Sequence, residues 1–289
     1  MLKPVHALRV AWPRPGDPLP GFRFALITTV FWIGLIVALP LTALIIRPWQ
    51  EGTGAMVAAM QDSRMFAALR ISFTTAFLAA LLDVPLGIIL AWSLVRAHLP
   101  GRRVVDALID LPFAIPTAVT GITLATLYGP QGWLGAPLKY LGISVAYTAT
   151  GIVVALMFVG LPFIVRSVEP VLREFPPELE EAAGLLGARP WQILTRVALP
   201  TLMPAIVSGF GLAFARGIGE YGSVIFIAGN QPFRSEIAPL LIVVRLQEFD
   251  YAGATSIAFV LLVASSVCLA GVAWLRRRVA RGLIAGADS

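Results

Sequence analysis

Six long apolar runs constrain this chain more than any other feature of its sequence. Most of them reach or approach the roughly 20 residues that an α-helix needs to cross the hydrocarbon core of a bilayer. No charged residue interrupts the first run, and a single carboxylate, Asp83, interrupts the second. The sequence therefore predicts an all-α membrane protein whose roughly six transmembrane helices form one domain. The six runs cover approximately residues 24–46, 71–95, 111–128, 147–165, 199–215 and 252–275.

The composition supports a membrane protein. Of the 289 residues, 58% are hydrophobic and 13% are charged, whereas about 25% of the residues in an ordinary soluble domain are charged. The length alone would suggest about two soluble domains, but the apolar runs override that expectation. The single cysteine, Cys268, lies in the sixth run, where we expect a small buried apolar side chain. With one cysteine the chain cannot form an intramolecular disulfide.

Basic residues are distributed unevenly between the two sides of the predicted membrane domain. Fifteen of the 22 lysines and arginines fall in segments 3–23, 96–103, 166–196 and 276–281. Because cytoplasmic loops of membrane proteins carry an excess of basic residues, this distribution predicts that both termini lie in the cytoplasm. It also explains the net charge of +6 better than a nucleic-acid partner would.

The start of the first apolar run and the end of the sixth divide the chain into three parts. We expect residues 1–23 to form a cytoplasmic tail, residues 24–275 the transmembrane domain and residues 276–289 a basic cytoplasmic tail. The first apolar run is longer than the roughly 7–15 apolar residues of a secretory signal. We therefore expect it to remain as an uncleaved first span.

A charged segment at about residues 169–198 separates the fourth and fifth runs. Pro177 can begin a helix whose first turn is acidic, which suits the helix dipole. Gly184 and Gly187 are expected to break that helix, and Pro190 can open a second short helix before the fifth run. By composition alone, the segment fits an ordinary amphipathic loop on the membrane surface equally well.

The spacing within this segment is more specific than its composition. It follows the pattern E-A-A-x3-G-x9-(I/V)-x-L-P, which resembles the cytoplasmic coupling loop of bacterial ABC importer permeases. The resemblance implies that this EAA motif meets a separate ATPase. The motif residues that we assign to ATPase coupling are Glu181, Ala182, Ala183, Gly187, Leu199 and Pro200.

Further sequence motifs restrict the resemblance to one group of these permeases. D-L-P-F-A-I-P at 110–116 and R-G-I-G-E-Y-G at 216–222 are similar to strings of sulfate and molybdate permeases. I-F-I-A-G-N at 225–230 and R-L-Q-E-F-D-Y at 245–251 look like the T-type permease of sulfate/thiosulfate importers. From about residue 60 to 275, the chain is identified as a member of the type I ABC importer permeases.

The resemblance implies a function and a set of partners. The chain would carry sulfate or thiosulfate across a bacterial inner membrane, after delivery by a periplasmic sulfate-binding protein. It would pair with a W-type permease as a heterodimer and with two ATPase subunits, which bind the ATP and magnesium. This chain itself would hold no catalytic residue, cofactor or metal. Molybdate or another oxyanion, and a homodimer, remain the alternatives.

Charged residues at the end of the fifth run are candidates for the translocation path. Sulfate is a dianion that is costly to strip of water unless donors replace it, and charges inside spans are themselves costly. Arg216 and Glu220 lie four residues apart, with Gly219 and Tyr221 beside them. They either line or gate the path or form a buried pair that fixes helix packing.

The second and third runs carry other polar residues. Thr117 and Thr120 offer hydroxyls to the path, although hydroxyls in helices commonly bond to their own backbone. Asp83 would repel a dianion, so we expect a packing role for it. Pro112 and Pro116 are expected to set the entry and the bend of the third run.

Two other classes of protein fit the sequence less well. A gradient-driven secondary transporter often shows inverted repeats and acidic relays, whereas no repeat is evident and Asp83 is the only deep acid. A membrane enzyme is disfavoured because the chain lacks H-E-x-x-H and G-x-S-x-G motifs. It also lacks a P-loop, so any ATP hydrolysis is expected on a separate chain.

Overall fold

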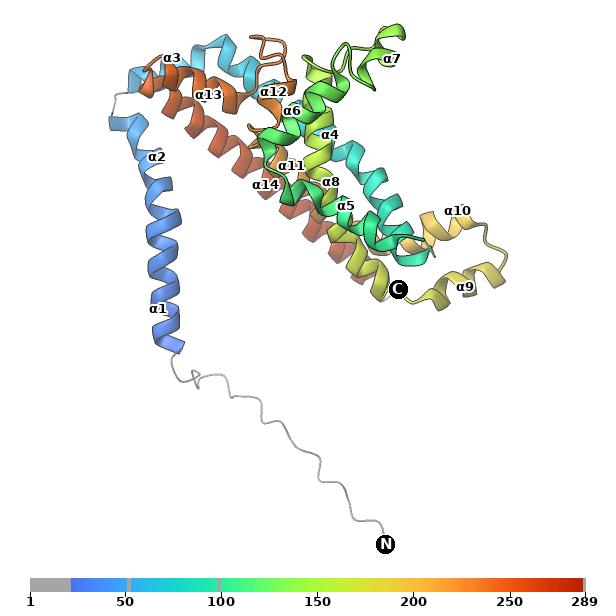
Figure 1. The fold of residues 1–289 in the computed structure, drawn as a ribbon. Helices are drawn as coiled ribbons and strands as arrows, with labels where there is room; N and C mark the ends of the chain where they lie inside the picture. The colour runs from blue at the N-terminus through green and yellow to red at the C-terminus, as the bar shows by residue number, and fades with distance from the viewer. Residues whose placement is uncertain (1–21, 51–52, 98–99, 288–289) are drawn as a thin grey trace.

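A computed structural model describes residues 22–50, 53–97 and 100–287, and this part of the chain is helical. Four long helices, α4, α8, α11 and α14, form a bundle (Figure 1). The short helices α9 and α10 lie at one end of this bundle, and α7, α12 and α13 lie at the other. The helices are α1 (Phe22–Ile33), η1 (Gly34–Ala38), α2 (Leu39–Gln50), α3 (Thr53–Gln61), α4 (Ser63–Arg96), α5 (Arg102–Ala114), α6 (Thr117–Tyr128), α7 (Gly135–Tyr140), α8 (Ala149–Glu174), α9 (Pro177–Leu185), α10 (Pro190–Ile193), η2 (Leu194–Ala198), α11 (Leu199–Ile218), α12 (Val224–Ile227), α13 (Ala238–Gln247) and α14 (Tyr251–Ala287).

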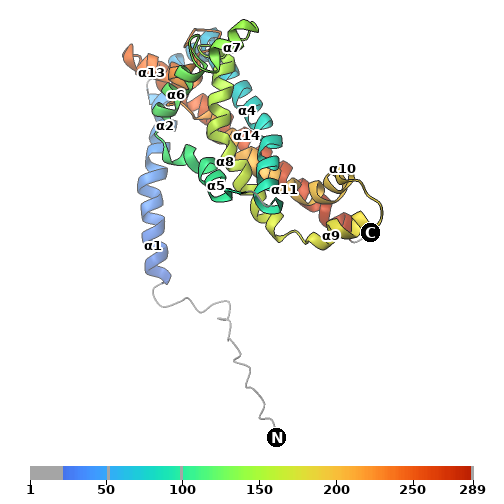
Figure 2. The ribbon, with the colours of Figure 1, turned by 45° about the vertical axis from the view of Figure 1, so that its right-hand side comes forward.

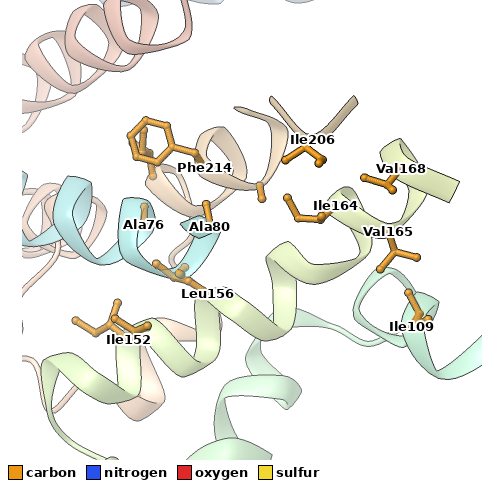
Figure 3. Close-up of a cluster of buried hydrophobic side chains, with 14 of the residues drawn as sticks. Ala76, Ala80, Ile109, Ile152, Leu156, Ile164, Val165, Val168, Ile206 and Phe214 are labelled. Carbon is orange, nitrogen blue, oxygen red and sulfur yellow. The ribbon is translucent and has the colours of Figure 1, made fainter. Parts of the chain in front are cut away.

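The core of the molecule lies where α4, α8 and α11 meet. Small side chains on α4, such as Ala76 and Ala80, pack against Leu156 of α8 and Phe214 of α11 (Figure 3). Between helices in lipid, small residues allow close approach, and the resulting van der Waals contacts supply much of the stability. This three-helix core fixes the position of one end of the bundle relative to the other.

Two glycines permit the closest approach between α4 and α8. A Cβ atom at Gly87 would overlap the side chain of Ile164, and one at Gly160 would lie 2.5 Å from Oδ2 of Asp83. Asp83 is 1% exposed, and neither of its carboxylate oxygens has a hydrogen-bond partner in the described part of the chain. Asp83 therefore lies in a packed helix interface without a hydrogen bond to a described residue, and its packing role stays a prediction.

Five helical segments are long and apolar enough to cross a membrane. They correspond to the first, second, fourth, fifth and sixth predicted runs, and most extend beyond the predicted bounds. The first comprises α1, η1 and α2, which stand beside the bundle (Figure 2). Its apolar side chains are exposed, as expected for a helix that lies against lipid or a partner subunit. The five segments are Phe24–Arg47, Ser63–Arg96, Ala149–Glu174, Pro190–Ile218 and Tyr251–Val279.

The third run is not the continuous span over residues 111–128 that the hydropathy indicates. Instead, α5 and α6 meet at an angle of 112°. The break falls at Ile115, which has extended backbone angles (φ −87°, ψ 132°) because the residue before a proline disfavours the helical region. Pro116 thus sets the bend, as expected, whereas Pro112 lies inside α5. The two helices count as a sixth span only if the bent pair is taken as one.

The charged segment also differs in detail from its expected bounds of 169–198. Its first six residues belong to α8, which ends at Glu174. A helix begins at Pro190, as expected, but it is not separate from the fifth span, because α10 continues through the π-helical turn η2 into α11. The fifth span therefore begins at Pro190 rather than at Leu199.

The contact between α4 and α8 can be tested by adding one methyl group. Gly87→Ala is expected to lower the free energy of unfolding by about 1–3 kcal/mol, because the added Cβ overlaps the side chain of Ile164. The measurement is the unfolding midpoint of the purified protein in detergent. Gly271→Ala in α14 is the matched control, since no heavy atom lies within 4 Å of its added Cβ. Equal midpoints for the two variants would contradict the close packing described above.

Candidate functional site

Glu181, Ala182 and Ala183 of the EAA motif lie on α9, at one end of the bundle (Figure 1). Pro177 occupies its first turn together with two glutamates, so the helix begins as the sequence predicts. Glu181 and Ala182 are exposed and Ala183 is half-buried. The small exposed side chain of Ala182 leaves room for close approach by another protein.

A turn at Gly187 ends α9. This turn explains why the motif places a glycine four residues after Ala183. Gly187 has φ +84°, the left-handed region that favours glycine. The amide of Ala188 donates to the carbonyl of Ala183 at 3.0 Å, and that of Gly187 to Gly184 at 2.9 Å. These two bonds form a Schellman motif, which caps the last carbonyls of the helix. Gly184 lies inside α9, so the expectation that it also breaks the helix is wrong.

Large exposed apolar side chains lie close to this turn. Leu185 is 90% exposed, Leu186 is 89% exposed and Trp191 is 71% exposed. An exposed apolar cluster of this kind marks a contact with another protein or with the membrane surface. Sequence reasoning assigned no role to these three residues, although an apolar pair directly before the turn glycine is a signal that could have revealed them.

An arginine at the end of α4 holds α9 against the bundle. Arg96 donates from Nη2 to the carbonyl oxygen of Phe175 at 2.8 Å and from Nε to Oε1 of Glu180 at 3.1 Å. Phe175 is buried, so this contact fixes the point where the chain leaves α8. Arg96 thus connects α4 directly to the EAA helix, a pairing across 84 residues of sequence that no local pattern reveals.

A second arginine ties α5 to α8 in the same half of the molecule. Arg166 contacts Asp106 at 2.8 Å, Asp110 at 2.6 Å and Glu169 at 2.7 Å. Glu169 is buried and also accepts from Arg173. Because Asp106 and Asp110 both lie on α5, this network holds the first arm of the bent helix pair on α8.

The other set of predicted residues lies at the opposite end of α11. Nη1 of Arg216 is 2.6 Å from Oε2 of Glu220, so the predicted pair forms. The helix ends at Ile218, however, and Glu220 lies in the turn that follows. Glu220 is 1% exposed and accepts from the backbone amide and the hydroxyl of Ser223, both at 3.0 Å.

The start of α6 packs directly on this turn. A Cβ at Gly121 would overlap the carbonyl of Ser223, and one at Gly222 would overlap the hydroxyl of Thr117. These two close approaches bring the start of α6 to the turn that holds Glu220. Sequence reasoning had grouped these segments only by resemblance, and the structure places them side by side.

The remaining predicted residues of this set differ in exposure. Gly219 is exposed and Tyr221 is half-buried against the main core. Thr120 is buried, and within the described part of the chain neither it nor Thr117 bonds to its own helix backbone, as Thr126 does. The expected backbone bonds of Thr117 and Thr120 are therefore not made, and their hydroxyls are available for other partners.

The sequence of this chain is similar to those of known membrane transport proteins. A family model described as "Binding-protein-dependent transport system inner membrane component" matches residues 83–284. The chain is 45% identical to the sulfate transport system permease protein CysT of Escherichia coli (strain K12), over 92% of this chain and 96% of that protein. It is 43% identical to CysT of Synechocystis sp., over 84% of this chain and 85% of that protein.

Solved structures with the same fold are more distant in sequence. A bacterial ABC transporter involved in the import of the acidic polysaccharide alginate aligns with a TM-score of 0.74 at 20% identity, covering 89% of this chain and 94% of that chain. The MetNI methionine ABC transporter aligns with a TM-score of 0.51 at 21% identity, covering 75% and 93%. The all-α permease fold expected from the sequence is thereby confirmed.

The role of Arg96 can be tested by its removal. Arg96→Ala is expected to increase amide hydrogen exchange of residues 177–186 by about fivefold, because a partly exposed ion pair contributes about 1 kcal/mol. Exchange in the core of α8 should not change. Arg103→Ala is the matched control, since Arg103 is exposed and makes no ion pair in the described residues. Unchanged exchange in α9 of the Arg96 variant would show that the contact does not hold this helix.

Proposed function

Because the chain belongs to the family of binding-protein-dependent transport system inner membrane components, we propose that it carries sulfate or thiosulfate as a permease subunit of an ABC importer. The choice of substrate rests on one observation. The chain is 45% identical, over nearly the whole length of both chains, to a permease named for sulfate transport. In this proposal, the exposed side chains beside Gly187 contact the ATPase, and the buried turn that holds Glu220 belongs to the path at the other end of α11.

We propose that the end of the bundle that carries α9 faces the cytoplasm of a bacterium. The arginines at 96–103, 166–196 and 276–278 gather at or near this end, as the positive-inside rule requires. Both termini then lie in the cytoplasm, and the domain of residues 24–275 crosses the inner membrane. The turn at Glu220 and the start of α6 lie toward the periplasmic side.

The coupling surface proposed here is larger than the EAA motif. It comprises the small residues Ala182 and Ala183, the turn at Gly187 and the exposed side chains of Leu185 and Leu186. Burial of a leucine side chain is worth about 1.5–3 kcal/mol, so the leucine pair can supply much of the affinity for an ATPase subunit. Arg96 then transmits movement of α9 to α4 through its two hydrogen bonds.

Leu199 and Pro200 have a more indirect part in this surface. They lie in the first turn of α11, on a helix that is continuous from Pro190, and both are half-buried. We propose that they make the junction between the contact surface and the fifth span rigid. A displacement of α10 would then move α11 and the Arg216 region at its far end.

The proposed assembly follows from the need for a motor and a substrate source. Two ATPase subunits bind ATP and magnesium, a W-type permease completes the membrane domain, and a periplasmic sulfate-binding protein delivers the anion. An alginate transporter with the same fold was crystallised in complex with a periplasmic protein, which supports the last of these partners. Molybdate or another oxyanion as the substrate, and a second copy of this chain as the partner permease, are the alternatives.

In the proposed path, Arg216 and Glu220 form a gate rather than a free anion site. The ion pair leaves little net positive charge for a dianion. The hydroxyls of Thr117 and Thr120 and the exposed backbone at Gly219 offer neutral donors in the same region. Neutral donors can replace the water of an oxyanion without trapping it.

The substrate can be tested with the assembled transporter in proteoliposomes. Binding protein loaded with sulfate or thiosulfate is expected to stimulate ATP hydrolysis and uptake of the labelled anion. Stimulation by molybdate alone would favour the alternative oxyanion. Failure of all three anions to stimulate hydrolysis would contradict the proposed function.

In the same assay, the double variant Leu185→Asp/Leu186→Asp is expected to reduce stimulated uptake by at least about tenfold, because two apolar contacts with the ATPase are lost. Leu185→Met/Leu186→Met keeps the apolar surface and serves as the matched control, with uptake near that of the unmodified transporter. If the aspartate variant transports at the rate of the methionine variant, the leucine pair does not contact the ATPase.

The gate can be tested by removing one or both members of its ion pair. Arg216→Ala leaves Glu220 buried with only the Ser223 donors, so assembly should be reduced by a loss of about 3 kcal/mol in stability. Arg216→Ala/Glu220→Ala removes the stranded charge and should recover assembly, but transport should stay well below that of the unmodified protein. Full transport by the double variant would leave the pair only a packing role.

A further inference from the structure

A groove opens between three helices in the half of the bundle that carries α9. Its volume is about 530 Å³, and it lies away from the turn at Glu220 and from α6. Its walls are mostly apolar or small, and two arginines from α14 stand at its mouth. The lining residues are Ser167 and Val171 of α8, Pro204, Ala205 and Ser208 of α11, and Arg276 and Arg277 of α14.

The groove exists because the three helices touch deeper in the bundle and diverge beyond that point. Gly209 allows α11 to approach α8, where an added Cβ would lie 3.0 Å from Cα of Ile164. Gly211 allows α11 to approach α14, where an added Cβ would lie 2.5 Å from the side chain of Val272. On the α9 side of Gly209, within about one helical turn, the small side chains of Ala205 and Ser208 leave the space between the helices unfilled.

The mouth of the groove carries uncompensated positive charge. Arg276 and Arg277 are exposed, and neither forms an ion pair with a carboxylate in the part of the chain that the structure describes. The next residue, Arg278, instead stacks over the ring of Trp274 at 4.3 Å. An exposed tryptophan two residues before an arginine run is typical of the level where a helix leaves the hydrocarbon layer for the headgroups.

We propose that this groove binds an anionic phospholipid. An acyl chain lies between α8 and α11 against Val171, Pro204 and Ala205, and the phosphate group contacts Arg276 and Arg277. The hydroxyl of Ser167 makes no hydrogen bond within the described residues, so it is available to a lipid ester oxygen. Basic pockets between helices on the cytoplasmic side suit anionic headgroups.

The apolar walls are the reason to choose a lipid over a free phosphate or sulfate ion. A small dianion would need donors on most sides, whereas this groove offers arginines only at its mouth. A lipid satisfies both parts of the groove at once, because its phosphate and its chain are joined. The bound lipid would fill the space between α8, α11 and α14 and so keep these three helices in register.

Native mass spectrometry of the assembled transporter can test this site, with phosphatidylglycerol and phosphatidylcholine of the same acyl chains as probes. Arg276→Gln/Arg277→Gln is expected to weaken phosphatidylglycerol binding by about thirtyfold, from a contribution of about fivefold per basic residue. Phosphatidylcholine binding should change by less than about threefold. Ala205→Leu, which fills the groove without altering charge, should weaken binding of both lipids.

The matched control is Arg102→Gln/Arg103→Gln, which removes the same charge from exposed positions of α5 outside the groove. It should leave phosphatidylglycerol binding within about twofold of the unmodified transporter. An equal loss in the control, or full binding by the Ala205 variant, would indicate general surface attraction and overturn the site. Displacement of the lipid by excess inorganic phosphate would overturn the lipid assignment in favour of a simple anion site.

Discussion

Close packing of α4, α8 and α11 through small residues is the constraint on which the rest of this structure depends. In lipid, apolar side chains gain little by leaving their surroundings, so helices associate where their backbones can approach. Gly87, Gly160 and Gly209 provide those positions, and larger residues would separate the helices there. Because the core is closely packed, a displacement at one end of a helix is passed to its other end.

Ion pairs join segments that are distant in sequence at both ends of the bundle. At the α9 end, long side chains form ion pairs between helices, as Arg96 does with Glu180 and Arg166 with three carboxylates. At the opposite end, Arg64 of α4 pairs with Glu236 at 2.7 Å, and Arg245 of α13 pairs with Asp62 at 2.9 Å. Also at this end, glycines bring backbone against backbone at the turn that holds Glu220, which suits a gate that must close tightly.

Local signals in the sequence were sufficient for most of the fold. Apolar runs identify five of the spans, and prolines mark both the start of α9 and the bend after Ile115. The EAA spacing matches a helix with a Schellman cap at Gly187, because glycine readily takes the required φ. Hydropathy failed at the third run, since it averages over α5 and α6 and is insensitive to the direction of the chain. It also placed the start of the fifth span too late, because α10 and η2 are polar but still helical.

The sequence by itself determined that this chain is a six-run, all-α membrane protein, which motif it carries and which family it resembles. These are properties of composition, period and spacing, and they need no knowledge of which segments meet. Only the tertiary structure decided that Arg96 holds the EAA helix, that Thr117 packs on the Glu220 turn and that the leucine pair beside Gly187 is exposed. Each of these depends on contact between residues far apart in sequence, or on the absence of such contact, and the helix packing that decides it is set by the shapes of all the helices together.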